Sequence, residues 1–75
     1  KQFWDIKTTM FDKVIFFKLG KFYEMFYNDA IICQKVFDLG WTNEPRKLHV
    51  GFPEKSLEKN IEILIGLGYK VAVVE

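Results

Sequence analysis

The chain has little of what a disulfide framework, a zinc site or a catalytic triad would need. Its 75 residues include one cysteine, Cys33, and one histidine, His49. A single cysteine cannot form an internal disulfide, and one cysteine with one histidine falls short of the ligand set of a structural zinc site. These counts exclude a disulfide-stapled fold, and they favour a reducing compartment inside the cell.

Long apolar runs and an excess of charge of one sign are also missing. No apolar stretch approaches the roughly 20 residues that a membrane-spanning helix needs, and Lys1–Met10 lacks the apolar run of a signal peptide. Lys and Arg number 11 against 10 Asp and Glu, for a formal net charge of +1. We therefore expect a soluble chain with no membrane partner, which bulk electrostatics alone would not hold on DNA.

Apolar and aromatic side chains, by contrast, are plentiful. Hydrophobic residues make up 49% of the chain and aromatic residues 17%, with eight Phe. A chain this short buries only about 60% of its unfolded surface, so a few large side chains must supply much of the core. We expect a single domain over residues 1–75. Because the chain lacks an initiator Met and ends inside an apolar run, we expect it to be a fragment of a larger multidomain protein.

The spacing of apolar residues and chain breakers predicts the element order αββαβαβ. The predicted elements are a helix over 3–11, two strands within 14–27 joined near Leu19-Gly20, a helix over 29–39, a strand over 49–52, a helix opening at Pro53, and a largely buried strand over 69–74. Asn28 and Asp29 are the predicted N-caps of the second helix, and Gly40 is its predicted stop. A strand, helix, strand sequence implies a right-handed crossover. The predicted fold class is therefore α/β, with a small mixed β-sheet flanked by helices.

No enzyme motif in the sequence is complete. Gly20-Lys21 follows a predicted strand as a phosphate-binding loop would, but Ile15 stands where that motif needs Gly, and Phe22 where it needs Ser or Thr. Cys33 lies on the apolar face of its predicted helix with no neighbouring base, and His49 has no recognisable ligand or triad partner. We expect a buried cysteine, a structural or surface histidine, no catalytic residue and no metal.

Strand geometry singles out Phe22 and Glu24 as candidate functional residues. In an extended segment, residues two apart share a face and stand about 6.6 Å apart along the strand. Phe26 continues their face, whereas Tyr23 and Met25 line the other. One face must pack on the core, and the face that carries Glu24 is the better candidate for exposure. From the residues alone, a core position for Phe22 is still the stronger reading, because the chain has eight Phe.

The segment around this pair resembles the N-terminal mismatch-recognition domain of the MutS family of DNA repair proteins. The family signature is a Gly followed by Phe-Tyr-Glu, then an aromatic residue and an Asp-Ala helix start, and residues 16–30, FFKLGKFYEMFYNDA, have this pattern. Residues 50–53, VGFP, and 68–75, GYKVAVVE, are similar to later segments of the same domain in the same order. Gly-Lys-Phe-Tyr-Glu and Gly-Phe-Pro resemble the eukaryotic subunit that reads base-base mispairs.

The resemblance implies that the chain binds mismatched double-stranded DNA. It implies that Phe22 inserts beside the mispaired base as a wedge, and that Glu24 hydrogen-bonds to that base. Unstacking costs less at a mispair, so the deformability of the duplex would be the signal. Neighbouring residues are further candidate DNA contacts: Gly20, Leu19, Lys21 and Lys18, with Arg46 and Lys47 as possible backbone contacts.

The resemblance also implies properties of a larger protein. MutS proteins hydrolyse ATP with Mg²⁺ in a distant C-terminal domain, so this fragment would itself be no enzyme and would hold no cofactor. A second MutS-homologue subunit would complete a heterodimeric clamp, and the nucleus is the expected location. The alternative from another class is a small protein-protein interaction module that uses an exposed Phe22-Tyr23 edge.

Overall fold

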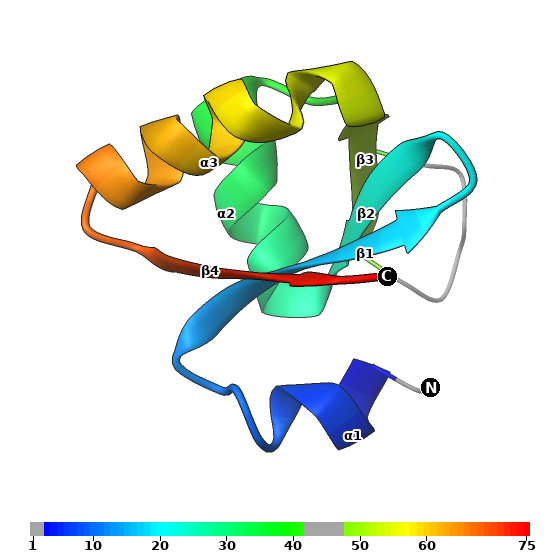
Figure 1. Ribbon diagram of the computed structural model, residues 1–75, viewed down its shortest axis with the longest axis vertical. Coiled ribbons are helices and arrows are strands. Elements are labelled where there is room, and N and C mark those ends of the chain that lie inside the picture. Colours follow the sequence, from blue (N-terminus) through cyan, green and yellow to red (C-terminus); the bar gives the residue numbers. More distant parts are fainter. Residues whose placement is uncertain (1–2, 42–47) are drawn as a thin grey trace.

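A computed structural model describes residues 3–41 and 48–75 of the chain. In these residues the elements are α1 (Phe3–Lys7), β1 (Lys13–Leu19), β2 (Phe22–Phe26), α2 (Tyr27–Phe37), β3 (His49–Pro53), a 3-10 turn η1 (Glu54–Ser56), α3 (Leu57–Gly66) and β4 (Lys70–Val74). The strands form one sheet in the order β3-β2-β1-β4 (Figure 1). β1 is parallel to β4 and antiparallel to β2, which is antiparallel to β3. The predicted α/β class with a small mixed sheet is confirmed.

The two faces of the sheet carry different helices. α2 and α3 lie over one face, and α1 lies on the opposite side (Figure 1). Alternation along β1 sends Val14 and Phe16 into the cluster that α2 and α3 complete, whereas Ile15, also fully enclosed, lies outside that cluster. β4 is an edge strand with only partial burial. The prediction of a largely buried final strand was wrong, because β4 pairs with β1 alone among the described strands.

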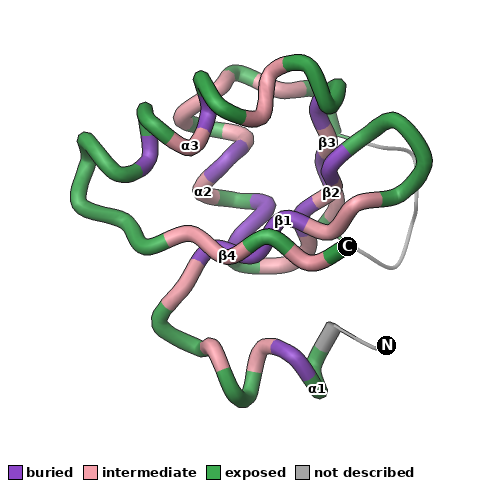
Figure 2. Tube along the Cα trace, in the orientation of Figure 1, coloured by how far each residue is buried: buried purple, intermediate pink, exposed green. Residues whose placement is uncertain are grey.

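The larger core lies between the sheet and the α2–α3 layer. Figure 2 shows buried stretches where β1, β2 and β3 face α2. The buried members of this core are Val14, Phe16, Tyr23, Met25, Ala30, Cys33, Val50, Phe52 and Leu64. Phe16 and Phe52 meet edge to face with ring centroids 5.1 Å apart, an arrangement that adds roughly 0.5–1.5 kcal/mol beyond the area buried. Because Tyr23 and Met25 of β2 are committed to this core, their neighbours in β2 must face the other way.

A buried ion pair fastens α1 to the sheet. The Nζ of Lys7 donates to both carboxylate oxygens of Asp29, at 2.9 and 3.2 Å, and to the carbonyl oxygen of Lys13 at 2.6 Å. The backbone N–H of Ile15 donates to the same carboxylate at 3.2 Å. Asp29 is 1% exposed, so these donors replace water around its charge. The prediction of Asp29 as a helix cap was wrong: the N-cap of α2 is Phe26, which makes no side-chain cap bond.

Both ends of α2 lie earlier in the chain than predicted. Tyr27 leaves the extended conformation with φ 58°, and its N–H donates to the carbonyl of Leu48 at 2.7 Å. At the other end Asp38 adopts the left-handed conformation, φ 54°, and its N–H donates to the carbonyl of Gln34. A left-handed residue stops the helix. Asp38 therefore takes the part that the sequence analysis assigned to Gly40.

α3 also differs in detail from the helix that the sequence predicts. Pro53 ends β3 instead of opening the helix, and η1 separates the two. On the inward face Leu64 is fully buried and Asn60 is 6% exposed, whereas Ile65, which the spacing predicts to face inward, is 58% exposed. Leu57 and Ile61 of α3 pack against the core together with Leu64, so Ile65 lies off the buried face.

Candidate nucleic-acid interface

A tight hairpin presents Phe22 at the end of the sheet. Leu19 of β1 pairs with Phe22 of β2, which leaves only Gly20 and Lys21 in the turn. Gly20 has φ 63°, the left-handed region that favours glycine, and a hairpin turn with glycine in its first central position matches the twist of the flanking strands. The predicted chain reversal near Leu19-Gly20 is confirmed. It leaves the side chain of Phe22 48% exposed.

Phe22 and Glu24 share one face of the sheet, as strand alternation predicts. Glu24 lies opposite Phe17 of β1 and opposite Gly51 of β3. This is the face on which α1 lies, because Phe17 and Ile6 of α1 border the same hollow. On the β2–β3 half of the face the side chains remain half-buried or exposed. An exposed aromatic ring and a half-buried carboxylate thus stand side by side.

An open hollow of about 280 Å³ lies between these side chains, lined by Phe22, Glu24, Gly40 and Gly51. A Cβ added at Gly51 would stand 3.4 Å from the Cγ of Glu24 and 3.2 Å from the carbonyl oxygen of Tyr23. The contact with Glu24 is an ordinary van der Waals distance, whereas the contact with the oxygen of Tyr23 is tight. Glycine at position 51 therefore lets β3 lie close to the backbone of β2 beside the Glu24 side chain. Sequence reasoning did not assign Gly51 to the site, since only the β2–β3 register places it opposite Glu24.

His49 is the main site residue that the sequence analysis missed. Its Nε2 is hydrogen-bonded to the Oε1 of Glu24, and its ring stacks on Phe26 with centroids 4.6 Å apart and an interplanar angle of 15°. Phe17 meets Phe26 edge to face at 5.8 Å. The side chain of His49 is 14% exposed and that of Glu24 is 22% exposed. His49 lies 25 residues after Glu24 in the chain, so no local spacing could pair them.

The other predicted DNA contacts of the hairpin fall into two groups. Leu19 is 53% exposed beside Phe22, and Gly20 and Lys21 are exposed in the turn. The structure brings these residues together with the wedge. Lys18 is on the opposite face, because the alternation of β1 turns it away from Leu19. Lys18 is therefore close to Leu19, Gly20 and Lys21 in the sequence, but it lies on the other face of the sheet.

The surroundings of Lys18 hold it on that opposite face. Its Nζ lies 3.2 Å from the Oε2 of Glu54 and 5.5 Å from the centre of the Tyr23 ring. The hydrogen bond to Glu54 raises the pKa of Lys18 above its usual value, so the side chain stays charged. The two possible backbone contacts, Arg46 and Lys47, lie outside the described residues.

Tyr23 does not form part of an exposed edge. Its side chain is 3% exposed and packs near the rings of Phe16 and Phe52, at 6.5 and 5.8 Å between centroids. Its hydroxyl donates to the Oε2 of Glu75 at 2.9 Å, and this bond raises the pKa of Tyr23. The alternative of an interaction module with a Phe22-Tyr23 edge is therefore corrected, since only Phe22 of the two is exposed.

The remaining reactive groups of the described residues do not build a catalytic or metal centre. Cys33 is fully buried, and burial raises its pKa to about 12, with a smaller contribution from Asp29. A thiol in this state is a poor nucleophile at neutral pH. Within residues 3–41 and 48–75, no three His, Cys, Asp or Glu side chains are grouped to hold a metal ion. No helix in those ranges is long and apolar enough to cross a membrane.

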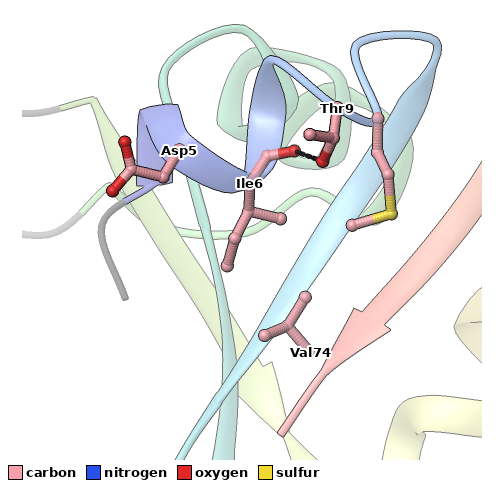
Figure 3. A pocket seen from close by; sticks show the side chains of 5 residues that line it. Asp5, Ile6, Thr9 and Val74 are labelled. Atoms are coloured by element: carbon pink, nitrogen blue, oxygen red, sulfur yellow. Dashed lines mark hydrogen bonds between the residues drawn. The ribbon is translucent and has the colours of Figure 1, made fainter.

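A second hollow, of about 410 Å³, lies between α1 and β4. Its lining residues are Asp5, Ile6, Thr9, Met10 and Val74. Ile6 and Val74 border it from α1 and from the edge strand, and the hydroxyl of Thr9 donates to the carbonyl of Ile6 at 2.8 Å (Figure 3). The hydroxyl of Thr9 is thus already satisfied by a carbonyl of α1. This hollow is a packing gap at the sheet edge, separate from Phe22 and Glu24.

Comparison with known proteins identifies the family of the chain. The family model described as MutS domain I matches residues 1–75. The chain belongs to the MutS domain I family. It is 47% identical over 75 residues to the DNA mismatch repair protein MSH6 of Arabidopsis thaliana and 45% identical over 76 residues to the probable DNA mismatch repair protein Msh6 of Drosophila melanogaster. It is 38% identical over 80 residues to the DNA mismatch repair protein MutS of Streptococcus uberis.

Each of these alignments covers 100% of this chain but only a small part of the relative. The covered part is 6% of the two MSH6 proteins and 9% of the MutS protein. The family resemblance expected from residues 16–30 is therefore confirmed over the whole chain. The relatives are much longer proteins that share this domain.

Proposed function

We propose that this MutS domain I recognises mismatched duplex DNA, with Phe22 inserted beside the mispaired base and Glu24 hydrogen-bonded to that base. The observation that carries the proposal is the pairing of a 48% exposed aromatic ring with a half-buried carboxylate at one open hollow. A nucleic acid base offers a π-face and a polar edge at once. The two side chains match these two features.

An exposed phenylalanine can detect a mispair in any sequence context. A paired duplex hides its base faces, so the test is how easily the stack opens. Inserting an apolar wedge costs a few kcal/mol of unstacking, and less where pairing is already poor. Stacking on Phe22 then returns about 1–3 kcal/mol for any base. Phe22 begins β2 next to the hairpin turn, so its ring can enter a groove without unfolding the core.

Glu24 supplies a polar contact to the same base. A carboxylate close to DNA phosphates is repelled, so it is tolerable there only if it gains a hydrogen bond from a base edge, or is protonated and donates one. Because Glu24 lies two residues from Phe22 on the same face, its carboxylate can reach the base on which the ring stacks. The stacking of Phe22 and the hydrogen bond of Glu24 would then both form with the same base.

The turn residues beside the wedge are proposed groove and phosphate contacts. Lys21 is exposed at the turn, and no atom lies within 4 Å of a Cβ built at Gly20, which leaves the backbone open to close approach. Leu19 is exposed next to Phe22. Lys18 would have to leave Glu54 to reach a phosphate, so its support is weaker.

We propose further that the domain works inside a longer protein. It spans 6% of its MSH6 relatives, and its formal net charge of +1 is too small to supply DNA affinity alone. Other domains and a second MutS-homologue subunit would clamp the duplex, and a distant domain would hold ATP and Mg²⁺. The location would be the nucleus, and the role DNA mismatch repair.

The test is the substitution Phe22→Ala in the complete protein with its partner subunit. Affinity for a duplex with one mispair is compared with affinity for the matched duplex. We expect a loss of at least about fivefold in this ratio, because stacking worth about 1–3 kcal/mol is removed. Phe11→Ala is the control, because Phe11 is 77% exposed before the start of β1, at the end away from the hairpin. An unchanged ratio in Phe22→Ala would refute the proposal.

A further inference from the structure

We infer that His49 is a positioning residue for Glu24: it holds one carboxylate oxygen so that the other faces the mispaired base. The inference deepens the proposed function and rests on it. Its basis is the hydrogen bond between the Nε2 of His49 and the Oε1 of Glu24, across the β2–β3 pair. No motif in the sequence joins these two residues.

The direction of this hydrogen bond follows from the chemistry of the two groups. An ionised carboxylate only accepts hydrogen bonds, so the Nε2 of His49 must be the donor, whether the ring is neutral or charged. A bond to a charged acceptor is stronger than one between neutral groups. His49 can therefore keep Glu24 in one orientation while the hollow is open to water.

Neighbouring side chains keep both partners in place. The imidazole stacks on Phe26 at 4.6 Å, and Phe26 is itself flanked by Phe17. On the Glu24 side, Gly51 lies directly opposite across the β2–β3 pair, and both residues line the hollow. A side chain held by packing and by a hydrogen bond presents its free atom more accurately than a mobile one. The stack on Phe26 thus fixes the ring that binds the carboxylate.

The second oxygen of Glu24 is the one available to DNA. In the described part of the chain Oε1 is the oxygen that has a partner, and the carboxylate borders the hollow next to Phe22. A duplex laid over the hollow removes water from Glu24, and a carboxylate without water needs donors for both oxygens. His49 serves Oε1 in every complex. A base edge reaches Oε2 only where the stack has opened, so the arrangement favours a mispair over a matched pair.

Two substitutions of His49 separate its hydrogen bond from its ring. His49→Phe keeps a ring to stack on Phe26 but has no donor, whereas His49→Gln keeps an amide donor at similar reach and loses the ring. Affinities of the complete protein for mismatched and matched duplexes are measured as above. We expect His49→Phe to lower the ratio about fivefold to tenfold, which lies within the range of an ordinary protein hydrogen bond. We expect His49→Gln to stay within about twofold of the wild type.

A double-mutant cycle with Glu24→Ala tests whether His49 acts through Glu24. If it does, His49→Phe changes nothing further once Glu24 is Ala, whereas independent effects would multiply. Equal losses from His49→Phe with and without Glu24 would overturn the inference, as would a loss from His49→Gln as large as that from His49→Phe. Thermal unfolding of each variant measures folding separately.

Failure of the inference can be told from failure of the proposed function. If Phe22→Ala and Glu24→Ala both keep the wild-type ratio, the proposed DNA contact is wrong and the inference falls with it. If those two lower the ratio and His49→Phe does not, the contact stands and only the positioning role of His49 is refuted.

Discussion

The two faces of the sheet use aromatic residues in opposite ways. On the α2–α3 face, Phe16 and Tyr23 interlock with Phe52 and are almost fully buried. On the other face Phe22 is 48% exposed, although it is the immediate neighbour of Tyr23, which is 3% exposed. One step along a strand reverses the direction of the side chain. Strand alternation therefore divides an aromatic-rich segment into residues that stabilise the fold and a residue that is free to bind.

The faces also differ in what holds them to their helices. Apolar packing joins the sheet to α2 and α3, whereas α1 combines its buried Ile6 with polar bonds from Lys7 to Asp29 of α2 and to the carbonyl of Lys13 in β1. The open half of the face on which α1 lies is the half that carries the hollow between Phe22 and Glu24.

The largest expected effect on stability comes from removing a buried aromatic ring, compared with removing the exposed one. Phe16→Ala should lower the free energy of unfolding by about 3–5 kcal/mol, because a fully buried ring leaves a cavity. Phe22→Ala should change it by no more than about 0.5 kcal/mol, as for other exposed positions. Urea denaturation of the two variants measures both. Comparable losses in the two variants would mean that the faces are not divided as described.

A smaller loss is expected when α1 is released. Lys7→Met leaves Asp29 charged and 1% exposed without its main partner, and breaking such a pair costs about 3 kcal/mol. Lys13→Met is the matched control, because the side chain of Lys13 pairs with the exposed Asp12, and surface pairs contribute little. Denaturation midpoints compare the two. An equally small effect in both would show that the ion pair does not hold α1 in place.

The smallest expected effect on stability is at Gly51. Gly51→Ala would place a Cβ 3.2 Å from the backbone oxygen of Tyr23, which cannot swing aside, and overpacking of this kind costs about 1 kcal/mol. The same Cβ would meet the Cγ of Glu24 at 3.4 Å, an ordinary contact, so the mismatch ratio of the complete protein should stay close to the wild-type value. In Gly66→Ala, in α3 and away from the hollow, nothing lies within 4 Å of the new Cβ, so this control should not be destabilised. A wild-type denaturation midpoint in Gly51→Ala would contradict the close approach of Gly51 to the backbone of Tyr23.

Much of the fold could be predicted from local patterns. The turn at Gly20, the strands around it and the amphipathic character of α3 follow from residue type and spacing, and the structure has them. The wrong predictions concern residues whose role depends on the three-dimensional structure around them. Asp29 resembles a helix cap until Lys7 approaches it, and Gly40 resembles a helix stop, although Asp38 already provides the left-handed residue.

The candidate site also contains residues that local patterns predict and residues that only the tertiary structure brings together. Phe22 and Glu24 could be found on one face because a strand alternates with a period of two residues, a property of the local backbone. Their neighbours His49 and Gly51 are brought to them by the β2–β3 register. Lys18 was grouped with Phe22 because the two are close in the sequence, but the structure places Lys18 on the opposite face of the sheet.

By itself the sequence determined the α/β class, the MutS domain I family and the face shared by Phe22 and Glu24, because these depend on residue type, local spacing and a motif of contiguous residues. Only the tertiary structure decided which aromatic rings are buried, that Lys7 pairs with Asp29, and that His49 is hydrogen-bonded to Glu24. Those contacts join residues 22 and 25 positions apart in the chain. Their formation depends on sheet register and helix docking, which arise only when the whole core assembles.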